Sequence, residues 1–147
     1  MTGPGAERPV TVRCPFCTTL NRVDLARLSL RPRCAECKRP ILLDRPLLVT
    51  EQDLYETVRT ASVPVVVDFY ADWCAPCRAM APHVDAFAAE HAGEVLVLKV
   101  DTDQNPGVLQ QFGIRGIPTM IGFRDGREAK RHVGMANPAV LGTLAGL

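Results

Sequence analysis

Two continuous apolar runs stand out between residues 60 and 101, where an alternating pattern is absent. Pro64 to Tyr70 is rich in valine and contains one charged residue, Asp68. Val95 to Val100 repeats the pattern around a single Lys99. Apolar β-branched runs of this length are typical of strands that are covered on both faces. We therefore predict two buried strands.

Around these strands, the pattern predicts short helices and a hairpin. Thr50 to Asp53 matches a capping box that opens a helix to about Thr60. Hairpin strands are expected on either side of a turn that contains Asp125 and Gly126. The full set is a short edge strand at 47–49, helices at 50–60, 74–91, 105–112 and 137–144, and hairpin strands at 119–123 and 128–133. This order implies an α/β fold with a mixed sheet and helices on both faces.

The amino-terminal third reads differently. Residues 1–12 are rich in Gly and Pro and offer little that could pack, so we expect a mobile leader. We expect residues 13–45 to form a small module of short strands, a helical turn, or both. A linker around Leu43 to Pro46 then leads into the main domain, residues 46–147.

Four cysteines lie in this small module. Cys14 and Cys17 form one Cys-x-x-Cys pair, Cys34 and Cys37 form another, and sixteen residues separate the pairs. This spacing is typical of a site in which four thiolates hold one zinc ion, and a segment this short needs such support to fold. Iron in a rubredoxin-like site is the alternative metal. The zinc could be purely structural, or oxidation of its thiolate ligands could release it and so regulate the protein; no organic cofactor is expected.

Charge is distributed unevenly. Residues 1–45 carry nine Lys and Arg against four Asp and Glu, and the remainder carries eight against twelve. A basic module could contact nucleic acid or an acidic protein, but we favour a solvated module docked on its acidic neighbour, without a nucleic-acid partner. Neither a signal peptide nor a membrane-spanning run is evident, so we expect no membrane association and a cytoplasmic location, where thiols stay reduced.

The remaining two cysteines, Cys74 and Cys77, directly follow the first predicted strand. A Cys-x-x-Cys pair at a strand-to-helix junction indicates redox chemistry. Free N–H groups and the dipole at a helix start favour a thiolate at Cys74, which we expect to attack a substrate disulfide. Cys77 would resolve the mixed disulfide because we expect it to be more buried. Asp68 is either a functional carboxylate or one that is satisfied structurally.

These residues resemble a known family. Val67 to Arg78 looks like a thioredoxin active site, and Lys99 to Pro106, Phe112 to Thr119 and Val133-Gly134 are similar to later thioredoxin segments. The resemblance begins at about Pro46. With the two amino-terminal cysteine pairs, the chain resembles the zinc-containing bacterial type, thioredoxin 2. This implies a monomeric protein-disulfide reductase that thioredoxin reductase recharges and that reduces oxidised client proteins.

The resemblance also implies roles for single residues. Asp68 would take the proton of Cys77, and Lys99 would be its electrostatic partner unless it is simply a surface lysine. A substrate-binding surface would comprise Trp73, Pro76, Ile117 and Pro118. The Ile117–Pro118 bond would be cis; the alternative is an ordinary turn with a trans bond. For Trp73, the alternative to substrate contact is a place in the hydrophobic core. Ala75 stands where glycine is usual, which we expect to change the redox potential only mildly.

Two other functional classes remain open on the sequence. The chain could be a binding protein whose small module recognises a partner and whose larger domain serves as a scaffold. It could also be a thiol oxidase or isomerase, which the expected cytoplasmic location disfavours. The complete set of redox residues favours the reductase over both alternatives.

Overall fold

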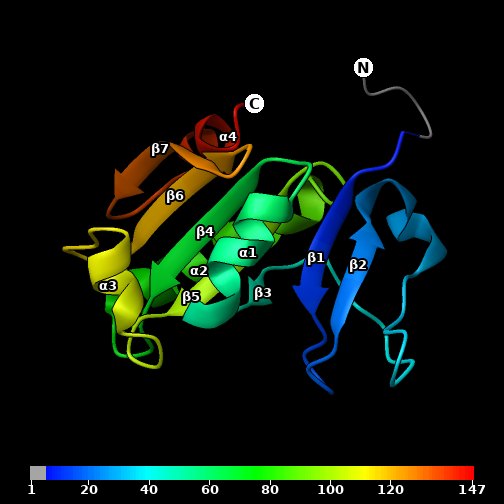
Figure 1. Cartoon of the computed structure of the whole chain (residues 1–147). Coiled ribbons are helices and arrows are strands. Elements are labelled where there is room, and N and C mark those ends of the chain that lie inside the picture. Colours follow the sequence, from blue (N-terminus) through cyan, green and yellow to red (C-terminus); the bar gives the residue numbers. More distant parts are fainter. Residues whose placement is uncertain (1–5) are drawn as a thin grey trace.

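A five-stranded mixed sheet organises the computed structural model, which describes residues 6–147. The strand order is β3-β5-β4-β6-β7; β3, β5 and β4 run parallel, and β6 and β7 run antiparallel to their neighbours (Figure 1). The bounds are Leu47–Leu48 for β3, Val65–Tyr70 for β4, Leu96–Asp101 for β5, Thr119–Arg124 for β6 and Arg127–Val133 for β7. The predicted mixed sheet, its edge strand and its hairpin are thus confirmed.

Helices cover both faces of this sheet, as the sequence predicts. They are α1 at Glu51–Thr60, α2 at Ala75–Glu90, α3 at Gly107–Gln111 and α4 at Pro138–Leu144. Side chains alternate along β4: Val65 and Val67 pack in one apolar cluster with α1 and α3, whereas Val66 packs in another with α2 and α4. Asp68 is two residues beyond Val66, so it points to the α2 side.

The small amino-terminal module contains both strands and a helical turn. Strands β1 (Pro9–Arg13) and β2 (Leu20–Asp24) pair antiparallel, and a 3-10 helix follows at Leu25–Leu30. The expected mobile leader is wrong for residues 9–12, because Val10 and Val12 of β1 are fully buried. Residues 1–5 of that leader lie outside the described part of the chain.

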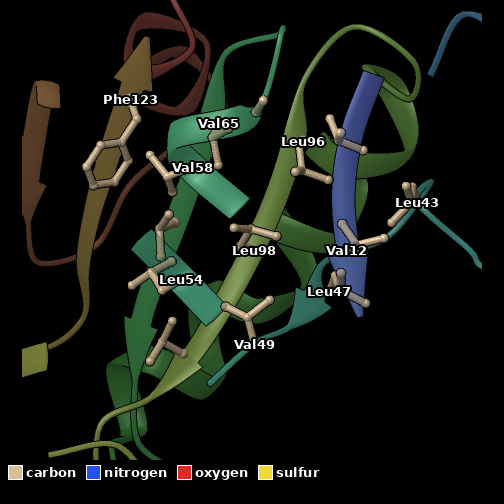
Figure 2. Close-up of a cluster of buried hydrophobic side chains, with 14 of the residues drawn as sticks. Val12, Leu43, Leu47, Val49, Leu54, Val58, Val65, Leu96, Leu98 and Phe123 are labelled. Atoms are coloured by element: carbon tan, nitrogen blue, oxygen red, sulfur yellow. The ribbon is translucent and has the colours of Figure 1, made fainter. Parts of the chain in front are cut away.

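The module shares its core with the main domain. One apolar cluster contains Val12 from β1 together with Leu47, Leu54 and Leu98, and Figure 2 shows Val12 on the side of the cluster formed by β3 and β5. Leu43, which we placed in a linker, is buried in the same cluster. Leu43 therefore anchors this segment in the shared core, while Asp44 and Arg45 are exposed, and the boundary at residue 46 does not separate two hydrophobic cores.

Polar contacts fix the same junction. Arg13 at the end of β1 forms a bidentate ion pair with Asp53 of α1, with N to O distances of 2.7 and 2.9 Å. This pairing explains why the predicted capping box is wrong: Thr50 makes no side-chain cap hydrogen bond, and the Asp53 carboxylate is held by Arg13. Asn105 caps the helix in its place, since its side-chain oxygen accepts from the Glu51 N–H at 2.9 Å.

We expect the Arg13→Ala variant to unfold at lower urea concentration than the parent protein. The guanidinium holds the pKa of Asp53 below its usual range, chiefly by hydrogen bonding. A carboxyl with a lowered pKa contributes stability above its unfolded pKa. The difference in stability between the parent and the variant should therefore shrink as the pH falls through the folded pKa of Asp53. Arg22→Ala is the matched control: its pair with Glu7 is more than half exposed on both sides, and the midpoint should hardly move. Equal shifts in both variants would contradict a specific role for the Arg13 pair.

No helix in residues 6–147 is long and apolar enough to cross a membrane.

Candidate functional site

The two cysteines that follow β4 are joined by a disulfide at the start of α2. Cys74 is the N-cap residue of that helix, and Cys77 lies in its first turn. The Cys77 N–H points at the Cys74 sulfur, 3.2 Å away. Once the disulfide is reduced, this donor and the helix dipole favour a thiolate at Cys74. The local geometry therefore supports the leading cysteine as the nucleophile.

Burial does not distinguish these cysteines, contrary to our expectation that Cys77 is more buried. Their exposed fractions are 3% and 4%. Their surroundings do differ, because Cys74 lines an open cleft of about 440 Å³ and Cys77 lines a small cavity of about 80 Å³. The two cysteines therefore differ in the space that each one lines and not in exposed area.

The cleft beside Cys74 brings together three of the predicted substrate-binding residues. Trp73 is 68% exposed on its rim, and Pro76 and Ile117 also line it. The Ile117–Pro118 bond is cis, as the resemblance implies, and the Ile117 carbonyl oxygen lies 3.8 Å from the Cys74 sulfur. Pro118 itself is buried and does not line the cleft. Its contribution is to set the course of the backbone at Ile117.

Several residues of this cleft escaped the sequence reasoning. They come from the loop after β5, from α3 and from the segment before β6, namely Thr102, Asp103, Leu109, Ile114 and Arg115. All lie in or next to segments that carry the family resemblance, but only the fold brings them beside the cysteines. Leu109 and Ile114 add apolar surface to the lining of the cleft, as is usual in binding clefts.

Asp68 and Cys77 line the same small cavity. Asp68 is 1% exposed, and its Oδ1 atom has no hydrogen-bond partner among residues 6–147. Burial raises the pKa of this carboxyl to about 6; the charge of Lys99 opposes the shift and that of Asp85 adds to it. A buried carboxyl that titrates near neutral pH can accept a proton from a neighbouring thiol.

Lys99 lies next to Asp68, but no ion pair joins the two. The two residues are directly opposed in the β4 and β5 register. The Lys99 ammonium instead lies 4.4 Å from the centroid of the Tyr70 ring, so it acts on Asp68 through space. Tyr70 is a residue of the site that sequence reasoning did not single out.

The Asp68→Asn variant should be more stable than the parent protein at pH 8, with the disulfide intact in both. Because the folded pKa of Asp68 lies above its unfolded value, its ionisation costs stability as the pH rises through about 6. Two pKa units correspond to about 3 kcal/mol at most. The difference in unfolding free energy should become small near pH 4, where the folded carboxyl is neutral and the unfolded one is only about half ionised. Urea unfolding at the two pH values measures it, and a difference independent of pH would contradict a raised pKa.

The other four cysteines gather in the amino-terminal module. The sulfur atoms of Cys14, Cys17, Cys34 and Cys37 all lie within 4.8 Å of one another, and two pairs across the knuckles are 3.7 and 3.5 Å apart. Tetrahedral zinc with bonds of about 2.3 Å places its sulfurs about 3.8 Å apart. This group could therefore hold a metal ion.

Both cysteine knuckles adopt one backbone design. The N–H of Cys14 donates to the Thr19 carbonyl and that of Cys34 to the Arg39 carbonyl, each at 2.8 Å. Hydrogen bonds from the Cys37 backbone and from the Asn21 amide lower the pKa of Cys34 to about 6. Donors aimed at sulfur favour the thiolate, which is the form that binds metal. The pKa of Cys37 is instead raised to about 11 by burial and by its neighbouring thiols, so the fit to zinc rests on the four clustered sulfur atoms themselves.

Comparison with known proteins agrees with this site. The Thioredoxin family model matches residues 45–144. Thioredoxin C-3 of Corynebacterium nephridii is 34% identical over 121 residues, 82% of this chain and 83% of that protein. Thioredoxin 1 of Synechococcus elongatus is 48% identical over 86 residues, 58% of this chain and 80% of that protein. A mutant thioredoxin structure from Halobacterium salinarum NRC-1 superposes with a TM-score of 0.62 at 32% identity, covering 73% of this chain and 96% of that one. The matched range includes the disulfide and its cleft, so this chain belongs to the thioredoxin family and is a thiol–disulfide oxidoreductase.

Proposed function

We propose that this protein is a general protein-disulfide reductase of the zinc-containing thioredoxin 2 type. The observation that carries the proposal is the placement of Cys74, whose sulfur opens onto an apolar cleft while its partner Cys77 faces a buried carboxyl. An extended client segment would bind in the cleft through the free backbone of Ile117 and against Trp73. Such binding gives affinity with little demand on sequence.

The reaction proceeds in two exchanges. The Cys74 thiolate attacks one sulfur of the client disulfide, forming a mixed disulfide and releasing the other client sulfur as a thiolate. Cys77 then loses its proton to Asp68 and attacks the Cys74 sulfur. That step forms the Cys74–Cys77 disulfide and releases the second client thiolate, so that the client gains two electrons and this protein loses two. Thioredoxin reductase would return the two electrons.

The four-cysteine module would hold one zinc ion in a structural role. Support comes from the shared core, because β1 contributes Val10 and Val12 to the cluster that also contains β5 and α1. Zinc would supply the cross-link that keeps the two knuckles, and thereby β1, in place. We place the protein in the cytoplasm, where reduced thiolates remain available both to zinc and to Cys74.

A coupled assay tests the reductase proposal. NADPH consumption is followed with a bacterial thioredoxin reductase and insulin as the disulfide client, and in parallel with dithiothreitol in place of the reductase. We expect turnover in both arms. Turnover in the dithiothreitol arm but not in the reductase arm would count against thioredoxin reductase as the electron donor. If the protein accelerates insulin reduction in neither arm, the proposed activity is contradicted.

A further inference from the structure

The small cavity beside Cys77 is lined by one aromatic ring, that of Tyr70, and by several charged side chains. Asp68, Tyr70 and Lys99 line it together with Cys77. Asp68 and Tyr70 are two positions apart in β4, so their side chains leave the strand on the same face. The ring and the carboxylate are therefore alternative neighbours for the single lysine on the adjacent strand.

Lys99 lies with the ring. Its ammonium is 4.4 Å from the ring centroid, within the range of an attractive contact between a cation and an aromatic face. Asp68 is the residue directly opposite Lys99 in the strand register, yet its buried Oδ1 atom has no hydrogen-bond partner in the described chain. A flexible lysine stem can point toward either neighbour, so the ring face determines where the charge lies.

The position of that charge affects the chemistry of the site. A lysine bonded to the Asp68 carboxylate would favour the charged form and make the group a poorer proton acceptor. We propose that Tyr70 is a positioning residue: its ring holds the Lys99 ammonium off the Asp68 carboxylate, which leaves Asp68 free to take the proton of Cys77. This inference rests on the role given to Asp68 in the proposed function.

Other charged groups face the same region, and a substitution at Tyr70 leaves their side chains chemically unchanged. Asp85 of α2 acts on Asp68 through space. Asp72 and Arg78 line the cavity, and the Arg78 guanidinium is engaged at 2.6 Å by the Asp72 carbonyl oxygen. Asp101 is the strand partner of Tyr70. A change confined to the Tyr70 ring therefore tests the position of Lys99 against a constant background.

Two substitutions separate the ring face from the rest of the side chain. Tyr70→Leu removes the aromatic face, and Tyr70→Phe keeps it while removing the hydroxyl. The titration of the Asp68 carboxyl is followed by NMR in the disulfide form of each protein. We expect the midpoint to fall by about one pH unit in Tyr70→Leu, because the freed lysine pairs with Asp68. It should be unchanged in Tyr70→Phe. An unchanged midpoint in Tyr70→Leu would overturn the inference.

A Lys99→Met background guards against an indirect structural effect. The double variant with Tyr70→Leu should have the same Asp68 midpoint as Lys99→Met alone, because it contains no lysine ammonium that loss of the ring could release. A shift that persists without Lys99 would also overturn the inference.

The pH profile of insulin reduction separates this inference from the proposed function. Its acid limb should move with the Asp68 midpoint in Tyr70→Leu. If the Asp68 midpoint falls while the pH profile of insulin reduction stays fixed, Tyr70 does position Lys99, but Asp68 is not the proton acceptor.

Discussion

The Cys74→Ser variant should lose insulin reduction by at least about a thousandfold, because a hydroxyl at this position cannot form the mixed disulfide. Cys77 cannot take over the attack, since its sulfur faces the cavity shared with Asp68 and not the cleft. The rate is measured with dithiothreitol as donor, so that recognition by a reductase does not enter. Activity above about one tenth of the parent value would mean that another cysteine carries the reaction.

Cys77→Ser serves as the matched control for this loss. It removes the resolving thiol from the same helical turn while leaving Cys74 at its N-cap. We expect this variant to react once with a disulfide client and then stop. Both variants should keep the parent circular dichroism spectrum, because each replaces sulfur by oxygen at a position that the helix itself supports.

Loss of the metal should destabilise the whole chain and not the amino-terminal module alone. Val10 and Val12 are fully buried against the main domain, and burial of a valine contributes about 1.5–3 kcal/mol. The Cys34→Ser variant, or chelated parent protein, should therefore lose at least about 3 kcal/mol of unfolding free energy. For a chain of this length that corresponds to a melting temperature lower by roughly 6–12 °C.

Metal content decides how this loss is interpreted. We expect one zinc per chain in the parent protein and in Cys74→Ser, and none in Cys34→Ser. An unchanged melting temperature in zinc-free protein would contradict the structural role. Stepwise peroxide addition then tests the regulatory alternative: zinc lost together with insulin reduction, while the Cys74–Cys77 pair remains reducible, would show a redox-responsive module. Zinc retained until the protein unfolds would support the structural role.

Local patterns predicted much of this molecule. The buried strands, the hairpin at Asp125-Gly126 and the two cysteine arrangements follow from runs, turns and spacings within about twenty residues. Asp68 could be found because a carboxyl in an apolar run is unusual. Features of this kind depend on neighbours along the chain, which the sequence displays.

Features that depend on distant neighbours were missed or misjudged. β1 lies in a segment flanked by Gly and Pro, and only docking on the main domain makes its two valines core residues. The capping box failed because Arg13, forty residues upstream, takes the Asp53 carboxylate. The choice of Lys99 between Asp68 and Tyr70 depends on side-chain conformation, which strand pairing alone does not determine.

Trapping the mixed disulfide tests the central claim most directly. The reduced Cys77→Ser protein is mixed with oxidised insulin, free thiols are blocked with iodoacetamide, and the cross-linked peptide is identified by mass spectrometry. We expect a disulfide between insulin and Cys74. The four amino-terminal cysteines should form disulfides neither with insulin nor with one another. Insulin attached to Cys14, Cys17, Cys34 or Cys37, or no adduct at all, would contradict Cys74 as the nucleophile of this thioredoxin.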